Sequence, residues 1–196
     1  MKICKTNKMK TLAIVTIVVV FTFGACGNAQ NKSADKETTK TEKEVKSPVM
    51  DIHTAAFIGN IDAIKGHIAT GTDLNVKDQY GSTPLNIAAT FGKTKVALAL
   101  IEGGADLNIT NNEGSTPLHT AAFFCRTEIV KALLTKGVDK TSKNVYGSTA
   151  LQSVSGPFDQ VKPIYEQLAK QLGPLGLKLD LERIKETRPV IVEILQ

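Results

Sequence analysis

One six-residue stretch decides the fold: Gly81-Ser82-Thr83-Pro84-Leu85-Asn86, which recurs as Gly114-Ser115-Thr116-Pro117-Leu118-His119 and as Gly147-Ser148-Thr149-Ala150-Leu151-Gln152. The copies are spaced 33 residues apart. The threonine of each copy can cap a helix through its hydroxyl group, and the proline of the first two copies suits the first helical position, where a missing N–H costs nothing. Each copy therefore predicts the start of a helix.

The same register aligns further landmarks on both sides of this stretch. A pair of alanines follows in the first three units, and a second apolar run comes next, such as residues 96–101 or 129–134. The residues that share this register are Ala55-Ala56, Ala88-Ala89 and Ala121-Ala122, His53, Asn86, His119 and Gln152, and the closing glycines Gly71, Gly104 and Gly137. This pattern resembles ankyrin repeats over roughly residues 49–172. The resemblance implies an all-α fold, an ankyrin-repeat solenoid of about four helix-turn-helix repeats with a helical C-terminal cap.

The repeat landmarks predict an ankyrin repeat domain at 49–196. Before it we expect a leader at 1–25 and, at 26–48, a segment that begins with Cys26 and continues as a flexible tether. The repeats are expected at about 49–80, 81–113, 114–146 and 147–178, followed by a cap at 179–196. The tether is polar and cannot bury enough surface to offset the entropy of ordering.

The terminal repeats are expected to be atypical, because they must present a polar outer face. In the first repeat Lys65 and His67 interrupt the apolar second helix, and we expect His67 to be solvated. In the fourth repeat Pro157 and Pro163 reset the second helix.

The tail beyond the fourth repeat reads as a truncated fifth unit that seals the stack. Asp180 is expected to cap a helix over Leu181–Glu186, and Pro189 to open a last one. A separate binding helix is the alternative reading of the tail.

The N-terminus has a lysine-rich start, an apolar stretch from Thr11 to Phe23 and small residues before Cys26, which is typical of an export signal. The segment Phe23-Gly24-Ala25-Cys26 resembles the lipobox of bacterial lipoproteins. The resemblance implies cleavage before Cys26, acylation of its sulfur, and a membrane-anchored protein that faces the periplasm or the cell surface. The alternatives are a cleaved signal with a free Cys26 and an uncleaved anchor.

The charge of the folded part excludes one class of partner. The whole chain carries a net charge of +5, but from residue 49 onward fifteen Lys and Arg residues face fifteen Asp and Glu residues. This neutral domain lacks the basic footprint of a nucleic-acid binder, so no nucleic acid is expected.

No convergent set of residues predicts catalysis, a metal site or a cofactor, so the chain is not expected to be an enzyme. The resemblance implies that His53 and His119 bridge neighbouring loops. Cys125 stands where earlier repeats have a turn glycine, so it should strain that turn, and its thiol is expected to be inert or redox-labile. An enzyme or small-molecule binder that uses Cys125 is the weaker alternative.

What remains is a surface that can bind a partner. In ankyrin repeats, partner contacts lie on the loop tips and at the exposed end of the first helix of each repeat. Carried over to this chain, these positions are Gln79, Tyr80, Asn112, Glu113, Val145 and Tyr146 on the tips, and Phe57, Ile58, Thr90, Phe91, Phe123 and Phe124 on the helices. Aromatic residues gathered there resemble interface anchors.

We therefore expect a monomeric interaction module that binds an unidentified protein or peptide on its concave face and is held to a membrane by its lipid. Two alternatives remain open. The phenylalanines can pack beneath adjacent loops instead, and the protein can be a structural envelope lipoprotein without a dedicated client.

Overall fold

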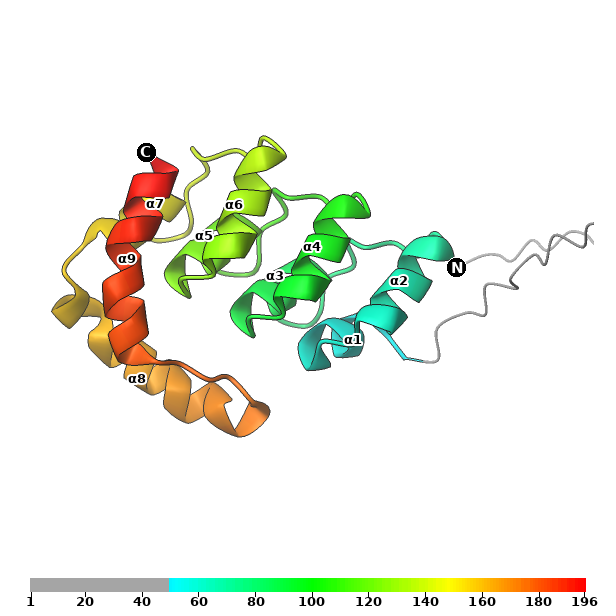
Figure 1. Ribbon diagram of the computed structural model, residues 1–196, viewed down its shortest axis with the longest axis horizontal. Coiled ribbons are helices and arrows are strands. Elements are labelled where there is room, and N and C mark those ends of the chain that lie inside the picture. The colour runs from blue at the N-terminus through cyan, green and yellow to red at the C-terminus, as the bar shows by residue number, and fades with distance from the viewer. Residues whose placement is uncertain (1–49) are drawn as a thin grey trace, which may run out of the picture. The chain divides into compact units, whose positions relative to one another are not determined.

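A computed structural model describes residues 50–196, so the predicted signal peptide, Cys26 and the tether lie outside the described residues. Within 50–196 the regular secondary structure is entirely helical (Figure 1). The elements are α1 (Ile52–Ile58), α2 (Ile61–Ala69), α3 (Pro84–Thr90), α4 (Thr94–Glu102), α5 (Pro117–Phe123), α6 (Thr127–Thr135), α7 (Ala150–Ser155), α8 (Phe158–Leu172), the 3-10 helix η1 (Gly173–Leu175) and α9 (Leu181–Leu195). The predicted all-α ankyrin-repeat solenoid is confirmed.

The recurring threonines begin three of these helices as the sequence predicts. The Thr83 hydroxyl accepts a hydrogen bond from the backbone N–H of Asn86 at 3.3 Å. Thr116 does the same in α5, and Thr149 in α7. Each cap satisfies one of the N–H groups that a helix start leaves without a partner, which stabilises the helix by about 1 kcal/mol.

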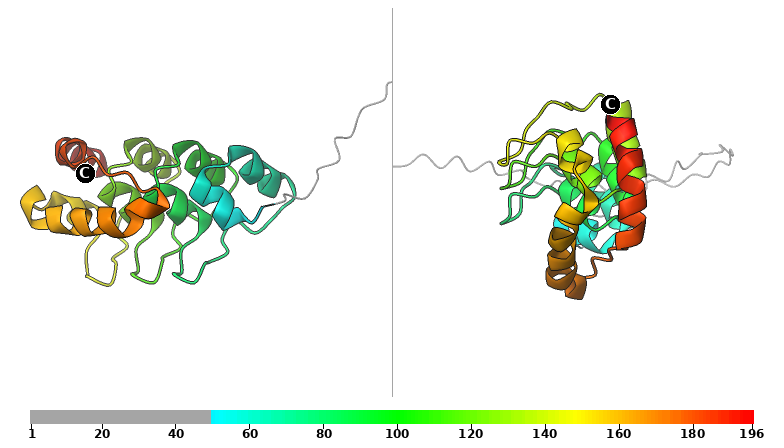
Figure 2. Two further views of the ribbon diagram at one scale, coloured as in Figure 1. Left: turned by 90° about the horizontal axis from the view of Figure 1, so that it is seen from below. Right: turned by 90° about the vertical axis from the view of Figure 1, so that its left-hand side faces the viewer.

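The helices form two layers (Figure 2). Helices α1, α3, α5 and α7 lie next to the loops, and α2, α4, α6 and α9 lie on the far side. The alanine pairs of the first three repeats are fully buried, which lets consecutive first helices approach closely. Leu100, Ile129 and Leu133 of the second helices complete the core. Each repeat thus covers an apolar face that its neighbour leaves open.

The fourth repeat differs from the prediction. We expected its second helix over the residues that follow Pro157, but the helix that packs against α7 and α6 in that place is α9. The helix α8 is instead an additional element between α7 and α9, and Figure 1 shows it extending away from the second-helix layer. The expected repeat at 147–178 and cap at 179–196 therefore merge into one unit that carries α8 as an insertion.

The tail also forms one helix where we predicted two. Asp180 does cap it, since its carboxylate accepts a hydrogen bond from the Arg183 N–H at 3.1 Å. Pro189, however, lies inside α9 and does not start a new helix. Ile184, Ile191 and Leu195 form one buried face across an exposed Pro189. The free energy gained by burying apolar side chains on both sides of the proline offsets the loss of the backbone hydrogen bond that its ring prevents.

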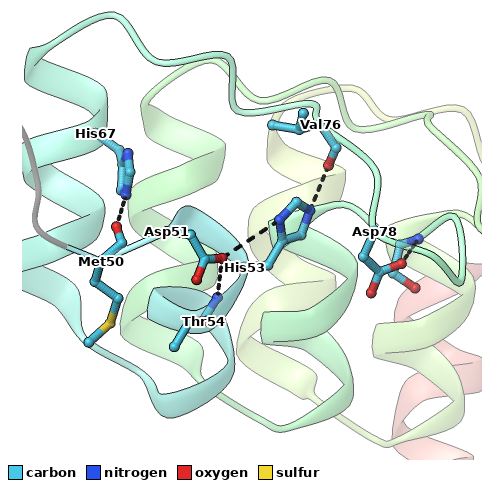
Figure 3. Close-up of polar contacts among 8 residues, drawn as sticks. Met50, Asp51, His53, Thr54, His67, Val76 and Asp78 are labelled. Carbon is cyan, nitrogen blue, oxygen red and sulfur yellow. Dashed lines mark hydrogen bonds and ion pairs between the residues drawn. The ribbon is translucent and has the colours of Figure 1, made fainter.

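The expectation that His67 is solvated is wrong. Its side chain is buried, and Nε2 lies 2.8 Å from the carbonyl oxygen of Met50 (Figure 3). Nδ1 lies 3.2 Å from the Thr72 hydroxyl. Because a carbonyl oxygen only accepts, Nε2 carries the proton. His67 therefore attaches the start of the domain to α2.

Candidate functional site

Three loops of identical construction project from the first-helix side of the stack (Figure 2). In the first of them the Asp78 carboxylate accepts hydrogen bonds from the N–H groups of Tyr80 and Ser82, both at 2.8 Å. Asn111 and Asn144 repeat this pattern in the next two loops. Such Asx turns fix the loop backbone locally. Our sequence analysis missed these three residues, although their spacing of 33 was a readable signal.

The tips of these loops are also bonded to one another. The Asn112 N–H donates to the carbonyl oxygen of Tyr80 at 3.1 Å, and the Val145 N–H donates to that of Glu113 at 3.0 Å. A Cβ atom on Gly81 would lie 3.0 Å from the backbone nitrogen of Asn112, so the tips approach too closely for a larger residue there. The tips form one continuous, preordered row.

The predicted tip residues all reach the solvent. Tyr80 is 66% exposed, Val145 65% and Tyr146 74%. Gln79, Asn112 and Glu113 are exposed beside them. Large apolar side chains exposed on a rigid row are typical of residues that a partner covers.

The predicted positions on the first helices differ from one another in solvent exposure. At the N-terminal end of the stack Ile58 is 48% exposed. Phe57 and Phe91 are half-buried and meet edge to face, with ring centroids 4.7 Å apart. Thr90 is half-buried, and its hydroxyl donates to the carbonyl oxygen of Asn86 at 3.0 Å. This part of the helix row remains partly accessible.

The C-terminal part of the helix row is covered. Phe124 is only 8% exposed, so the prediction that it lies on an open partner surface is wrong. Phe123 is half-buried and stacks on Tyr165 of α8, with ring centroids 4.6 Å apart. At Phe123 the physical reason is the insertion of α8, whose Tyr165 packs on the ring. Phe124 in turn packs edge to face against Phe123, with ring centroids 5.2 Å apart.

Polar side chains bridge each first helix to the next loop, as predicted for two of them. The His53 Nε2 donates to the carbonyl oxygen of Val76 at 2.9 Å (Figure 3). The His119 Nε2 donates to that of Ser148 at 3.0 Å, while its Nδ1 lies 2.8 Å from the Thr116 hydroxyl. In the second repeat the Asn86 side-chain amide makes the bond equivalent to that of His53, and donates to the carbonyl oxygen of Ile109 at 3.3 Å. These hydrogen bonds position the loops.

Burial affects the titration of one of these groups. Desolvation lowers the pKa of His119 below its usual 6.5, and the hydrogen bond to Ser148 opposes that shift only in part. His119 is therefore neutral at neutral pH, as its role as both donor and acceptor requires.

Cys125 has the backbone strain that we predicted, with a φ of 53° where a glycine would relax. Its thiol is buried and donates weakly to the carbonyl oxygen of Ile184 at 3.7 Å. Burial raises its pKa to about 11, against the opposing effect of nearby arginines. The thiol is therefore protonated at neutral pH and a poor nucleophile.

Within residues 50–196 no cluster of three or more His, Cys, Asp or Glu side chains is arranged to hold a metal ion. The helices of this same region include none with the length and apolar character that a membrane span requires.

Comparison with known families agrees with this geometry. A family model described as "Ankyrin repeats (3 copies)" matches residues 52–144, which contain α1 to α6, the first two loops and the start of the third. This segment is therefore an array of three ankyrin repeats, and such repeats generally mediate protein binding. Comparison with the curated proteins found no match.

Proposed function

We propose that this protein is a membrane-tethered protein-binding module that holds a protein or peptide partner along its loop tips. The observation that carries the proposal is the exposure of Tyr80, Val145 and Tyr146 on a row of hydrogen-bonded tips. Because the tips are already ordered, little conformational entropy is lost when a partner binds. Ile58 and Phe91 at the accessible part of the helix row are the next candidates for contact.

Affinity capture with the full-length lipidated protein, from detergent-solubilised membranes of cells that produce it, tests this proposal. The amount of partner recovered with the double variant Tyr80→Ser plus Tyr146→Ser should be at least about tenfold lower than with wild type, because exposed aromatic anchors dominate binding energy. The matched control is Leu175→Ser, which removes an apolar side chain that is 56% exposed on η1, away from the tips. Equal recovery with the double variant and the wild type would refute the role of the tips.

We further propose that Cys26 carries the lipid that holds the module at a bacterial membrane, with the domain on the periplasmic or outer side. The support is the sequence Phe23-Gly24-Ala25-Cys26 behind an apolar stretch that is too short to span a bilayer comfortably. Several acyl chains on one cysteine would give a lasting anchor, whereas one chain gives only marginal binding.

Metabolic labelling with an alkyne fatty acid tests the anchor. The label should be present in wild type and in Cys125→Ser, and absent in Cys26→Ser, and mass spectrometry should place the mature N-terminus at Cys26. A wild-type protein without label, or a Cys26→Ser protein that retains it, would contradict this assignment.

A further inference from the structure

A cavity of about 270 Å³ lies where the turn between α5 and α6 meets the segment that leads into α9. Residues 124–126 line it from the turn, and residues between Lys178 and Ile184 line it from the other side. Figure 1 shows that the start of α9 and this turn lie at the same edge of the stack. The cavity is distinct from the loop tips, which project from another side (Figure 2).

The lining of this cavity is strongly cationic. Arg126, Lys178 and Arg183 contribute positive charges, and Asp180 contributes the one carboxylate of the lining. The Asp180 carboxylate is already engaged as the cap of α9 by the backbone N–H of Arg183. Across residues 50–196 none of the three cations forms an ion pair with a carboxylate. With three cations and one carboxylate, the lining keeps an excess of positive charge.

Arg126 is held in place at this cavity. Its Nη2 donates to the carbonyl oxygen of Thr90 at 3.1 Å, and its Nε donates to that of Ala89 at 3.4 Å. The ring of Phe124 lies 5.9 Å from the guanidinium carbon. Nη1 has no hydrogen-bond partner within the described part of the chain. A guanidinium group that is fixed, half-buried and still has free donors is suited to an oxyanion.

The electrostatics of neighbouring groups agree with this geometry. Burial and the repulsion of Arg183 both lower the pKa of Arg126, so the two guanidinium groups lie close enough to repel. At the thiol of Cys125, burial raises the pKa, and Arg188, Arg126 and Arg183 oppose it. Of these three, Arg126 and Arg183 line the cavity, and an anion bound between these two groups would relieve their repulsion.

We propose that this cavity binds an oxyanion group, either a carboxylate or a phosphate, between Arg126 and Arg183. The group can belong to a small anion in solution or to an acidic group on a bound protein, and the two sources share the same recognition chemistry. This site does not include the loop tips. The proposal of an oxyanion site is therefore independent of where the proposed partner binds.

The test is thermal unfolding of the full chain with inorganic phosphate, or with a capped diglutamate peptide, against chloride at equal ionic strength. Binding to the native state raises the melting temperature of wild type. The shift should disappear in Arg183→Gln, whose exposed side chain has no structural hydrogen bond within residues 50–196. Lys185→Gln is the matched control, because it removes the same charge from α9 outside the cavity lining and should keep the shift.

A second variant, Arg183→Glu, places a carboxylate opposite Arg126. It should melt higher than Arg183→Gln without added anion and should no longer respond to phosphate. A larger shift with the peptide would identify an acidic group of a macromolecule as the source, and a larger shift with phosphate a small anion. The proposal fails if neither probe shifts wild type beyond chloride, or if Arg183→Gln shifts as much as wild type.

Discussion

The hydroxyl group of Tyr165 donates a hydrogen bond to the carbonyl oxygen of Phe123 at 2.6 Å, and the two rings stack. The same hydroxyl accepts a hydrogen bond from Arg188 Nη1 at 3.1 Å. Arg188 is a buried cation whose Nη2 donates to the carbonyl oxygen of Gly156 at 3.0 Å. Burial raises the pKa of Tyr165 to about 12, so the phenol keeps its proton. One hydroxyl therefore connects α5, α8 and α9.

Removing this hydroxyl should destabilise the C-terminal half of the stack. Tyr165→Phe leaves the Phe123 carbonyl with only the long 4.0 Å contact from Cys125 Sγ, and leaves one donor of the buried Arg188 without a partner. Each lost hydrogen bond costs about 1–3 kcal/mol. Urea unfolding followed by circular dichroism measures the effect. The control is Tyr146→Phe, an exposed tyrosine whose hydroxyl makes no hydrogen bond within the described residues, and its effect should stay within about 0.5 kcal/mol. Equal stabilities for the two variants would contradict the role of Tyr165.

The contribution of the contact between loop tips to stability can be measured by comparing alanine substitutions at two glycines of matching conformation. Gly81 has a φ of 70° and Gly147 a φ of 72°, so alanine at either position costs about 1 kcal/mol or more from backbone strain alone. A Cβ on Gly81 would also collide with Asn112, whereas one on Gly147 would meet nothing within 4 Å. Gly81→Ala should therefore unfold at a lower urea concentration than Gly147→Ala. Identical midpoints would show that the tips do not restrain each other.

The lowered pKa of His119 predicts a pH dependence of stability. The unfolded chain binds a proton near pH 6.5, while the folded protein resists protonation until a lower pH. The unfolding free energy is thus fully retained above this value and decreases as the pH falls below it. In urea titrations at about pH 7.5 and about pH 5.5, His119→Gln should show a smaller loss than wild type. Glutamine preserves the capping box, as Gln152 does in α7. An unchanged pH dependence would place the titration elsewhere.

The buried thiol of Cys125 should be protected from reagents. In a protein with Cys4→Ser and Cys26→Ser, the remaining thiol should react with a disulfide reagent at least about a hundredfold more slowly in the native state than in urea, because only the exposed thiolate reacts. Absorbance of the released thiolate follows the reaction. Native labelling as fast as in urea would mean that the turn at Cys125 is open.

Much of the repeat array could be predicted from local chemistry. Thr83, Thr116 and their prolines fix helix starts within a few residues, and the paired alanines fix how closely the first helices pack. The tip positions followed from the resemblance to ankyrin repeats, carried over to this chain through the 33-residue register. These signals are readable because each acts within its own repeat or on the next one.

The C-terminal quarter could not be predicted in the same way. An amphipathic segment follows α7. No local sequence feature shows whether this segment forms the second helix of the fourth repeat or an inserted helix. The outcome depends on whether α8 or α9 packs better against the apolar face of α6 and α7, and this is decided by tertiary contacts. Because α8 is inserted there, its Tyr165 packs on Phe123, so the error in the fold also affected the predicted site. For Pro189, burial of Ile184 and Ile191 on either side outweighed a local breaker.

The placement of α9 has a consequence for the order of assembly. The first three repeats can each complete their helix pair as soon as both helices are available, because their partners are neighbours in sequence. Helix α7 instead pairs with α9, and 25 residues separate Ser155 from Leu181. Until α9 packs in place, the folding chain exposes the apolar faces of α6 and α7, so the last repeat is where a chaperone would bind.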